Sequence, residues 1–394
     1  MTTDARRTDA RLENLPLAAI RRRLHTLAER SNEERRTAEF VRQELEACEP
    51  DALVTELGGH GVAAVFEGRA AGPTVLLRCD LDALPMAGTL DVEHRADDPE
   101  TAHTCGHDGH MTVQIGVARA LAEQRPERGR VVLLFQPAEE TGEGARAVLD
   151  DPRFAELSPT RAVAFHNLPG RPLGEVTLRN GPFASASVGM IVELTGVSSH
   201  AAEPHMGRSP VAAAANIAQS IQSAPQRAAA LEENVQATVV GIEVGGPAFG
   251  TSPGSGRVMA TLRAHTSQAM HALCEYCERM ARGLAAGHGL ECDVTWTERF
   301  PATENHPAVV RVVERAARAN GLDVRRAEHP FSWSEDFGHF TSSTCGALFG
   351  LGSGVDQPPL HHPDFDFPDD LLEPAVRLFV AALPELLADE LPKR

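Results

Sequence analysis

The sequence predicts a two-domain α/β protein in which a smaller domain of β-α-β-β-α-β order is inserted into a larger one. At 394 residues the chain exceeds the size at which single hydrophobic cores stop growing, so two domains are expected. Three apolar strand patterns in the first half each run into chemically reactive side chains. From Ser185 the hydrophobic pattern changes, and a separate series of strands and helices follows.

We expect the larger domain to comprise residues 1–184 and 299–394, and the inserted domain to comprise residues 185–298. The insertion begins with the alternating strand SVGMIVELTGVSSH, continues through a helix, two strands and a long helix, and ends with the strand LECDVTWTERF. This order is the ferredoxin-like arrangement, and a length of roughly 110 residues is normal for a domain.

The segment HTCGHDGH, residues 103–110, is the richest in potential metal ligands. Cys105 and His107 are two positions apart, so on an extended segment both side chains would leave the same face. Thiolate and imidazole suit zinc and its first-row neighbours, whereas magnesium or calcium would require oxygen ligands. An isolated Cys-x-His pair is common in polar loops, so further ligands must come from elsewhere in the chain.

Two apolar strands supply such ligands. RVVLLFQPAEE runs from a strand into Glu139 and Glu140, and RAVAFHNLPG runs from a strand into His166. In open α/β sheets, ligands bind at the carboxyl ends of the strands, so these side chains can converge with Cys105 and His107. The sequence therefore predicts a metal site at this edge of the sheet.

Two further pairs of residues have more than one interpretation. Asp80 and Asp82 follow the buried strand PTVLLRC, where a carboxylate could orient a ligand, hold a loop or form an ordinary turn. His361 and His362 stand between a glycine-rich loop and a terminal amphipathic helix. Either histidine could supply a late ligand or cap a turn, and spacing alone does not choose between them.

Composition excludes several classes of protein. Lys and Arg number 37 against 55 Asp and Glu, and the net charge of −18 argues against nucleic acid or an anionic membrane as a partner. The sequence contains no run of 18 apolar residues, and its start lacks the apolar stretch of a secretory signal. The seven cysteines are odd in number and scattered, which fits reduced thiols. We therefore expect a cytoplasmic protein.

Taken together, the motifs resemble those of the metal-dependent amidohydrolase and peptidase family that includes aminoacylases, hippurate hydrolases and indole-acetyl-amino-acid hydrolases. The resemblance spans nearly the whole chain and keeps the family's order. It rests on RRRLHTLAERSNEERRTA, RCDLDALPM, HTCGHDGH, FQPAEE, AFHNLPG, SSHAAEPH, SEDF and LHHPDFDF.

This resemblance implies a mixed-sheet, metallopeptidase-like catalytic domain with two divalent metal ions. Manganese and zinc are the expected ions, and cobalt and nickel are also compatible with sulfur, nitrogen and oxygen ligands. Cys105 is implied to lie between the ions, Glu139 matches the general base, and His361 fits the family pattern better than His362. The implied ligands are Cys105, His107, Glu140, His166 and His361.

The resemblance also implies that the inserted domain is a lid and dimerisation module of a homodimer. His200, in SSHAAEPH, would reach the active site of the neighbouring subunit. Two positions depart from the family pattern: Ala28 replaces a usual proline, and FGTSPGSG replaces an asparagine-containing segment around Gly250. The second departure affects a part of the lid that usually lines the substrate side.

The expected activity is hydrolysis of the amide bond of a small N-acyl amino acid. Glu139 would take a proton from metal-activated water and later protonate the leaving amine, while His200 would stabilise the developing oxyanion. A dipeptidase or carboxypeptidase of the same family is the alternative enzyme. A homologue that binds a metal or ligand without catalysis is the alternative outside enzymes.

Overall fold

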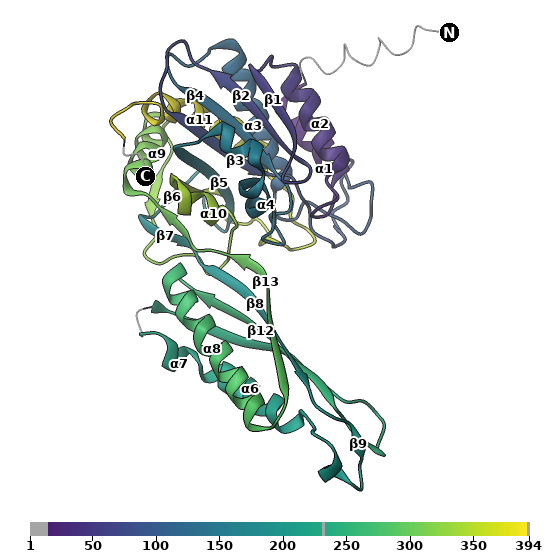
Figure 1. Ribbon diagram of the computed structural model, residues 1–394. Helices are drawn as coiled ribbons and strands as arrows, with labels where there is room; N and C mark the ends of the chain where they lie inside the picture. Colours follow the sequence, from purple (N-terminus) through teal and green to yellow (C-terminus); the bar gives the residue numbers. More distant parts are fainter. Residues whose placement is uncertain (1–14, 231–232, 392–394) are drawn as a thin grey trace. The chain divides into compact units, whose positions relative to one another are not determined.

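The computed structural model describes residues 15–230 and 233–391, and it divides into two compact units (Figure 1). Unit 1 contains the described residues up to Phe183, together with Thr303–His329 and the described residues from Asp336. Unit 2 contains Ala184–Ala302 and Pro330–Glu335. Most of the stretch at the start of the sequence, where no secretory signal is expected, lies outside the described residues.

Unit 1 is built on an eight-stranded mixed sheet with the order β1-β2-β4-β3-β5-β16-β6-β15. β3 is parallel to both β4 and β5, and β5 is parallel to β16, whereas β1, β2 and β4 pair antiparallel. This central mixed sheet confirms the coarse fold prediction. The strands are β1 (Ala52–Leu57), β2 (Gly61–Glu67), β3 (Thr74–Asp80), β4 (Arg130–Gln136), β5 (Arg161–Pro169), β6 (Val176–Leu178), β15 (Val324–Arg326) and β16 (Cys345–Gly354).

Helices pack on this sheet and enclose the larger hydrophobic core. β3 is buried along its whole length, as expected for a parallel strand covered on both faces. None of the helices in the described residues is long and apolar enough to cross a membrane. The helices of unit 1 are α1 (Leu17–Leu27), α2 (Arg35–Glu46), α3 (His107–Glu123), α4 (Gly144–Asp150), α5 (Pro152–Leu157), α9 (Pro307–Ala319), α10 (Gly338–Ser343) and α11 (Leu372–Leu386). A short pair, β7 (Gly181–Ala184) and β14 (Thr303–Asn305), lies apart from the main sheet.

Unit 2 has its own core between a four-stranded antiparallel sheet, in the order β10-β12-β8-β13, and two long helices. In chain order these elements are β8 (Ala186–Thr195), α6 (Val211–Ser223), β10 (Gln236–Val244), β12 (Ser255–Ala264), α8 (Ser267–Gly287) and β13 (Glu291–Phe300). Shorter elements are β9 (Ser199–His200), β11 (Thr251–Ser252) and α7 (Pro225–Ala228).

Residues 330–335 also join unit 2, although no hydrophobic periodicity in the sequence marks them. The backbone N–H of Ser185 donates to the carbonyls of Phe331 and Trp333, at 3.1 and 3.0 Å. Arg263 on β12 donates to the carbonyl of Ser332 and to the hydroxyl of Ser334, both at 3.1 Å. Long-range hydrogen bonds therefore assign this segment to unit 2.

A buried arginine joins three segments beneath the carboxyl ends of the central strands. Arg78 on β3 is 1% exposed, and it donates to Asp80 at 3.0 Å and to Asp336 at 2.6 Å. Its Nε donates to Oε1 of Gln136 at 2.9 Å. Because a buried guanidinium is costly unless its charge and hydrogen bonds are satisfied, these contacts fix β3, β4 and the Asp336 segment together.

Replacing Arg78 by Met keeps the apolar stem but removes the cation that pairs with two buried carboxylates. We expect the free energy of unfolding to fall by about 3–5 kcal/mol, as measured by urea denaturation followed by circular dichroism. Arg146→Met is the control, because Arg146 forms an exposed ion pair with Asp150 on the same helix. Its loss should lower the free energy of unfolding by about 0.5 kcal/mol or less. Equal losses in the two variants would contradict this interpretation.

Candidate metal centre

The ligand-rich loop ends earlier than the sequence suggests, because α3 already begins at His107. Gly106 precedes the helix with φ of 96°, a left-handed conformation that favours glycine. A Cβ there would also lie 2.7 Å from Oδ1 of Asn167. The expectation of an extended Cys105–His107 segment is therefore wrong: Cys105 lies in the turn before the helix, and His107 is its first residue.

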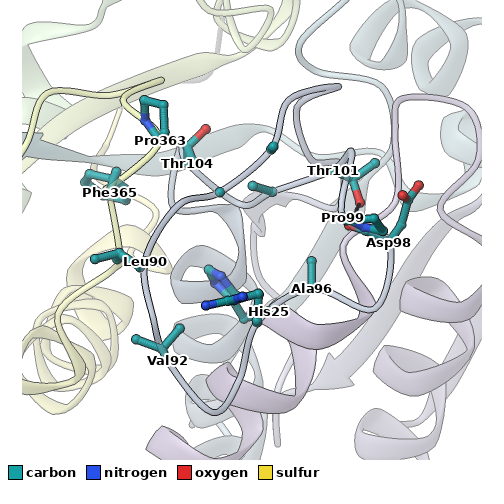
Figure 2. A pocket seen from close by; sticks show the side chains of 14 residues that line it. His25, Leu90, Val92, Ala96, Asp98, Pro99, Thr101, Thr104, Pro363 and Phe365 are labelled. Atoms are coloured by element: carbon teal, nitrogen blue, oxygen red, sulfur yellow. Dashed lines mark hydrogen bonds between the residues drawn. The ribbon is translucent and has the colours of Figure 1, made fainter.

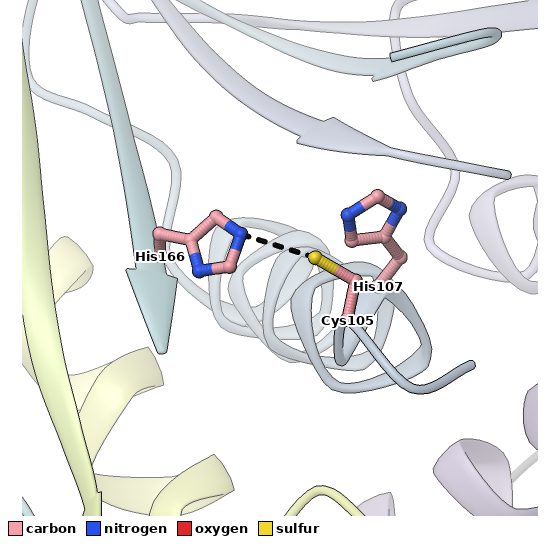
Figure 3. Close-up of side chains that lie close together, drawn as sticks. All are labelled: Cys105, His107 and His166. Carbon is pink, nitrogen blue, oxygen red and sulfur yellow. Dashed lines mark hydrogen bonds between the residues drawn. The ribbon is translucent and has the colours of Figure 1, made fainter. Parts of the chain in front are cut away.

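Cys105, His107 and His166 nevertheless come together in the interior of unit 1 (Figure 3). All three are buried, and each offers a ligand atom within 4.8 Å of the other two. The sulfur of Cys105 lies 3.5 Å from Nε2 of His166. His166 comes from within β5, which continues to Pro169, so the helix start and the neighbouring strand deliver these groups to one place.

Backbone carbonyls fix the tautomers of both imidazoles. Nδ1 of His107 lies 2.8 Å from the carbonyl oxygen of Asp82, and Nδ1 of His166 lies 2.9 Å from that of Asn167. Because a carbonyl can only accept, each Nδ1 carries a proton, and Nε2 is the nitrogen of each ring that remains to bind a cation. This is the usual arrangement for histidines that bind a metal through Nε2.

The two glutamates that follow β4 lie beside this group. Oε1 of Glu140 lies 3.8 Å from Nε2 of His107, and Oε2 of Glu139 lies 4.0 Å from the same atom. On its other side, Oε2 of Glu140 lies 3.7 Å from Nε2 of His361. Cys105, Glu140 and His361 form a second close group of potential ligands, so Cys105 belongs to both groups.

The structure distinguishes His361 from His362. Nδ1 of His362 accepts a hydrogen bond from the backbone N–H of Asp364 at 3.1 Å, which engages that ring in its own turn. His361 instead has φ of 63°, and its backbone N–H donates to the carbonyl of Thr104 at 3.0 Å. This left-handed conformation is unfavourable for a residue with a Cβ, and the neighbouring segment that carries Cys105 helps to hold it.

The chemistry of these residues fits a bound cation. Among the described residues, buried Nε2 of His107 and Oε1 of Glu140 have no hydrogen-bond partner. Burial raises the pKa of Glu140 to about 7, against the opposing charge of His107 and with a smaller contribution from the negative charge of Asp82. Burial and Glu140 likewise raise the pKa of the Cys105 thiol well above its usual value. A bound cation would supply the positive charge that these buried acids lack, and sulfur, nitrogen and oxygen donors together suit a divalent transition metal.

A model of peptidase family M20/M25/M40 matches residues 76–385. The chain belongs to this family. It is 30% identical over 365 residues to the N-acetylcysteine deacetylase of Bacillus subtilis (strain 168). This match covers 92% of this chain and 94% of the relative. It is also 30% identical over 370 residues to IAA-amino acid hydrolase ILR1-like 4 of Arabidopsis thaliana, covering 90% and 82% of the two chains.

Among solved structures, the chain is similar to a Bacillus subtilis protein described as a dinuclear metal binding peptidase from the M20 family. The TM-score is 0.80 at 26% identity, and the match covers 97% of this chain and 99% of the other. These similarities confirm the family predicted from the motifs. They also confirm that this M20 chain is a hydrolase acting on amide bonds.

Two other histidines of the sequence motifs, His110 and the predicted site residue His200, lie outside the two groups that share Cys105. His110 is engaged through both ring nitrogens, at 2.7 Å from Oδ1 of Asp80 and 2.6 Å from Oδ1 of Asn167, so it has no nitrogen left for a metal. His200 lies in unit 2, on the short exposed strand β9. The other six predicted site residues, Cys105, His107, Glu139, Glu140, His166 and His361, lie together in unit 1.

A cavity of about 230 Å³ adjoins the two segments that carry Cys105 and His361 (Figure 2). Its lining includes Thr104, directly before Cys105, and Pro363, two residues after His361. Most of the other lining side chains, such as Leu90, are apolar or small. A group bound there would therefore lie against both of these segments.

A separate cluster of potential ligands, His25, Asp108 and Asp366, already has a cation beside it. The guanidinium of Arg21 contacts both Asp108 and Asp366. Burial alone would raise the pKa of Asp108, but the hydrogen bond from His25 and the charge of Arg21 hold it well below its usual range. This cluster is an ion-pair network that joins α1 to the start of α3, and a metal ion is not needed to neutralise it.

Three buried carboxylates hold the loop that carries the glutamates. Glu34 accepts the N–H of Ala138 at 2.8 Å, and Asp336 accepts that of Ala145 at 2.8 Å. Asp82 accepts the N–H of Glu140 at 3.0 Å. Sequence reasoning considered Asp82 for holding a loop or orienting a ligand, but it missed Glu34 and assigned no role to Asp336. The one local signal was charged Arg78 within an apolar strand, which requires buried acceptors.

Glu34 makes the stability of the metal-free protein depend on pH. Burial, followed by the charge of Asp82, raises its pKa to about 7 from 4.5. The folded protein therefore keeps this proton to a higher pH than the unfolded chain, and the folded state loses stability as the pH rises from about 4.5 to about 7. Glu34→Gln should remove this loss, because its amide oxygen can still accept from Ala138.

The stability advantage of Glu34→Gln over the wild type should therefore grow by about 3 kcal/mol between pH 4.5 and pH 8. Urea denaturation of chelator-treated protein across this range measures the difference. If the free energies of unfolding of the two proteins changed in parallel with pH, Glu34 would not titrate as described.

Proposed function

We propose that this M20 enzyme hydrolyses the amide bond of N-acyl amino acids in a metal-dependent reaction. The observation that carries the proposal is the position of Glu139, a second buried carboxylate beside the group of possible ligands, 4.0 Å from Nε2 of His107. A purely structural metal site would enclose its ion with four ligands and need no such neighbour. The similar deacetylase and amino acid hydrolase support the choice of substrate class.

Two divalent ions would be held by Cys105, His107, Glu140, His166 and His361. Cys105 belongs to both close groups of ligand atoms, which supports the proposal that its thiolate lies between the ions. The similar structure is described as dinuclear, which supports the number of ions. Manganese or zinc would suit these ligands, and cobalt or nickel would be alternatives.

Bound metal would supply Lewis acidity that polarises the amide carbonyl and lowers the pKa of a water molecule. Glu139 would accept the proton of the attacking water and later donate it to the leaving amine. Glu139 is 5% exposed and its carboxylate is held by the backbone N–H of Asp336, so it keeps one orientation in a site with little bulk water. Adjacent Glu140 faces His107 and His361 and would bind metal.

His200 would stabilise the oxyanion of a substrate bound at a partner subunit. Its Nδ1 accepts the backbone N–H of Ala202 at 3.1 Å, which places the ring proton on Nε2. The exposed imidazole can therefore donate a hydrogen bond without being charged. In this proposal unit 2, with its ferredoxin-like order of elements, acts as the lid.

Unit 2 would also form the homodimer. β10 is an edge strand of its sheet, and its side chains Val240 and Ile242 are 62% and 51% exposed. An exposed apolar edge strand is a suitable surface for pairing with a second copy. The proposal also retains residues 185–298 as the limits of the inserted lid and dimerisation domain.

A substrate panel tests the function. Protein stripped by a chelator and reloaded with manganese, zinc, cobalt or nickel should release free amino acid from acetyl, benzoyl or indole-acetyl amino acids. Glu139→Gln should bind the same amount of metal but lose about 10³-fold or more in kcat. Cleavage of dipeptides alone would favour a peptidase, and near-normal turnover by Glu139→Gln would remove Glu139 from its role.

The ligand assignment is tested by adjacent histidines. His361→Ala should lower metal affinity and activity, whereas His362→Ala should leave the metal content within about two-fold, because His362 faces Asp364. Cys105→Ser should also weaken metal binding, since a hydroxyl is a poorer ligand than a thiolate. Metal content after dialysis against a competing chelator measures each change, and a wild-type value for His361→Ala or Cys105→Ser would refute that assignment.

A further inference from the structure

We propose that Asp336 is the positioning residue for the general base: it closes the loop between β4 and α4 so that Glu139 presents one carboxylate oxygen to the reacting water. Asp336 lies in SEDF, about 200 positions after that loop. The inference rests on the proposed function for the role of Glu139. The contacts that carry it all lie within unit 1.

The carboxylate of Asp336 bridges the two ends of this loop. Oδ2 accepts from Nε2 of Gln136, the last residue of β4, and from the backbone N–H of Ala145, in the first turn of α4, both at 2.8 Å. Oδ1 accepts from Arg78 at 2.6 Å. Since Asp336 is fully buried, both ends of the loop are held on one carboxylate that solvent does not reach.

The backbone of Asp336 contacts the base itself. Its N–H donates to Oε1 of Glu139, with a donor–acceptor distance of 3.4 Å. Oε2 of Glu139 is then the oxygen that lies 4.0 Å from Nε2 of His107, on the side of the possible ligands. One oxygen is held by the protein and the other faces the place where a metal-activated water would react.

The loop has little freedom apart from this contact. The N–H of Gly144 donates to the carbonyl of Ala138 at 3.0 Å, and that of Gly142 donates to the carbonyl of Glu139 at 2.8 Å. A Cβ at Gly144 would lie 1.6 Å from the carbonyl oxygen of Pro137. In so tight a turn, a shift at either end moves Glu139 directly, and a displacement of about 1 Å can cost about 10²-fold in rate.

The chain offers a matched pair of substitutions to test this role. Asp336 uses both carboxylate oxygens as acceptors, so the amide of Asp336→Asn must direct its NH2 group toward a donor. Glu34 holds the same loop, but its hydrogen bonds to Ala138 and Asn32 use only Oε1, and Glu34→Gln can retain them. The two variants each remove one buried carboxylate, but only the first breaks the closure.

In the metal-loaded enzyme acting on an N-acyl amino acid, Asp336→Asn should lower kcat by about 10²-fold and leave KM within about two-fold. Glu34→Gln should keep kcat within about two-fold. The absorption spectrum of the cobalt-loaded protein should be unchanged in both variants, because the possible ligands keep their own contacts. Wild-type kcat for Asp336→Asn, or a loss of bound cobalt that parallels the loss of kcat, would overturn the proposal.

Hydrogen exchange of chelator-treated protein provides a readout that does not require activity. The peptide containing residues 137–145 should exchange about ten-fold faster or more in Asp336→Asn, with no such change in Glu34→Gln. Unchanged exchange in Asp336→Asn would refute the positioning role even if no substrate were found. Failure of every substrate with the wild type, together with faster loop exchange in the variant, would instead refute the proposed function alone.

Gln136→Met is the second variant if Asp336→Asn does not fold. It removes one donor to Asp336 and the acceptor of Nε of Arg78, and it leaves the contact of Asp336 with Arg78. We expect a smaller effect in the same direction, with about ten-fold lower kcat and faster exchange of the same peptide. Wild-type values for both would overturn the proposal.

Discussion

Unit 1 depends on the neutralisation of one buried cation, the guanidinium of Arg78. A charge in the interior is tolerated only when acceptors surround it, and here they come from β3, from β4 and from the Asp336 segment. Asp80 extends the network, because its other oxygen contacts His110 on α3. These contacts therefore fix the positions of the strand ends and of the start of that helix relative to one another. The possible metal ligands on these segments cannot move independently.

Much of this architecture could be predicted from local sequence patterns. Buried parallel strands appear as apolar runs, so the polar residues that end such runs identify one edge of the sheet, and Glu139, Glu140 and His166 were found in this way. The start of α3 at His107 could not be found in this way, because the polar residues around it mask the helical period. A left-handed glycine sets that boundary, and its effect depends on the close approach of Asn167 from β5.

Other contacts could not be predicted from local sequence patterns, because they join residues that are far apart in the sequence. Glu34 holds Ala138 across 104 positions, and Gln136 contacts Asp336 across 200. Adjacent His361 and His362 differ by one position in their spacing to every motif, which does not separate them, whereas their backbone conformations and the contact with Asp364 do. Pattern reasoning therefore finds the side chains that do chemistry more readily than the buried carboxylates that hold them.

The assignment of residues 330–335 to unit 2 has a consequence for the evolution of this fold. The chain passes between the units at residues 183/184, 302/303, 329/330 and 335/336. A fragment that copied only residues 184–302 would lack the backbone partners of Ser185 and the carbonyl that Arg263 contacts. Recombination at the two borders of the insertion would thus transfer an incomplete unit. The recipient chain would have to supply this six-residue segment itself, and a segment of different sequence could do so where the contacts end on backbone carbonyls.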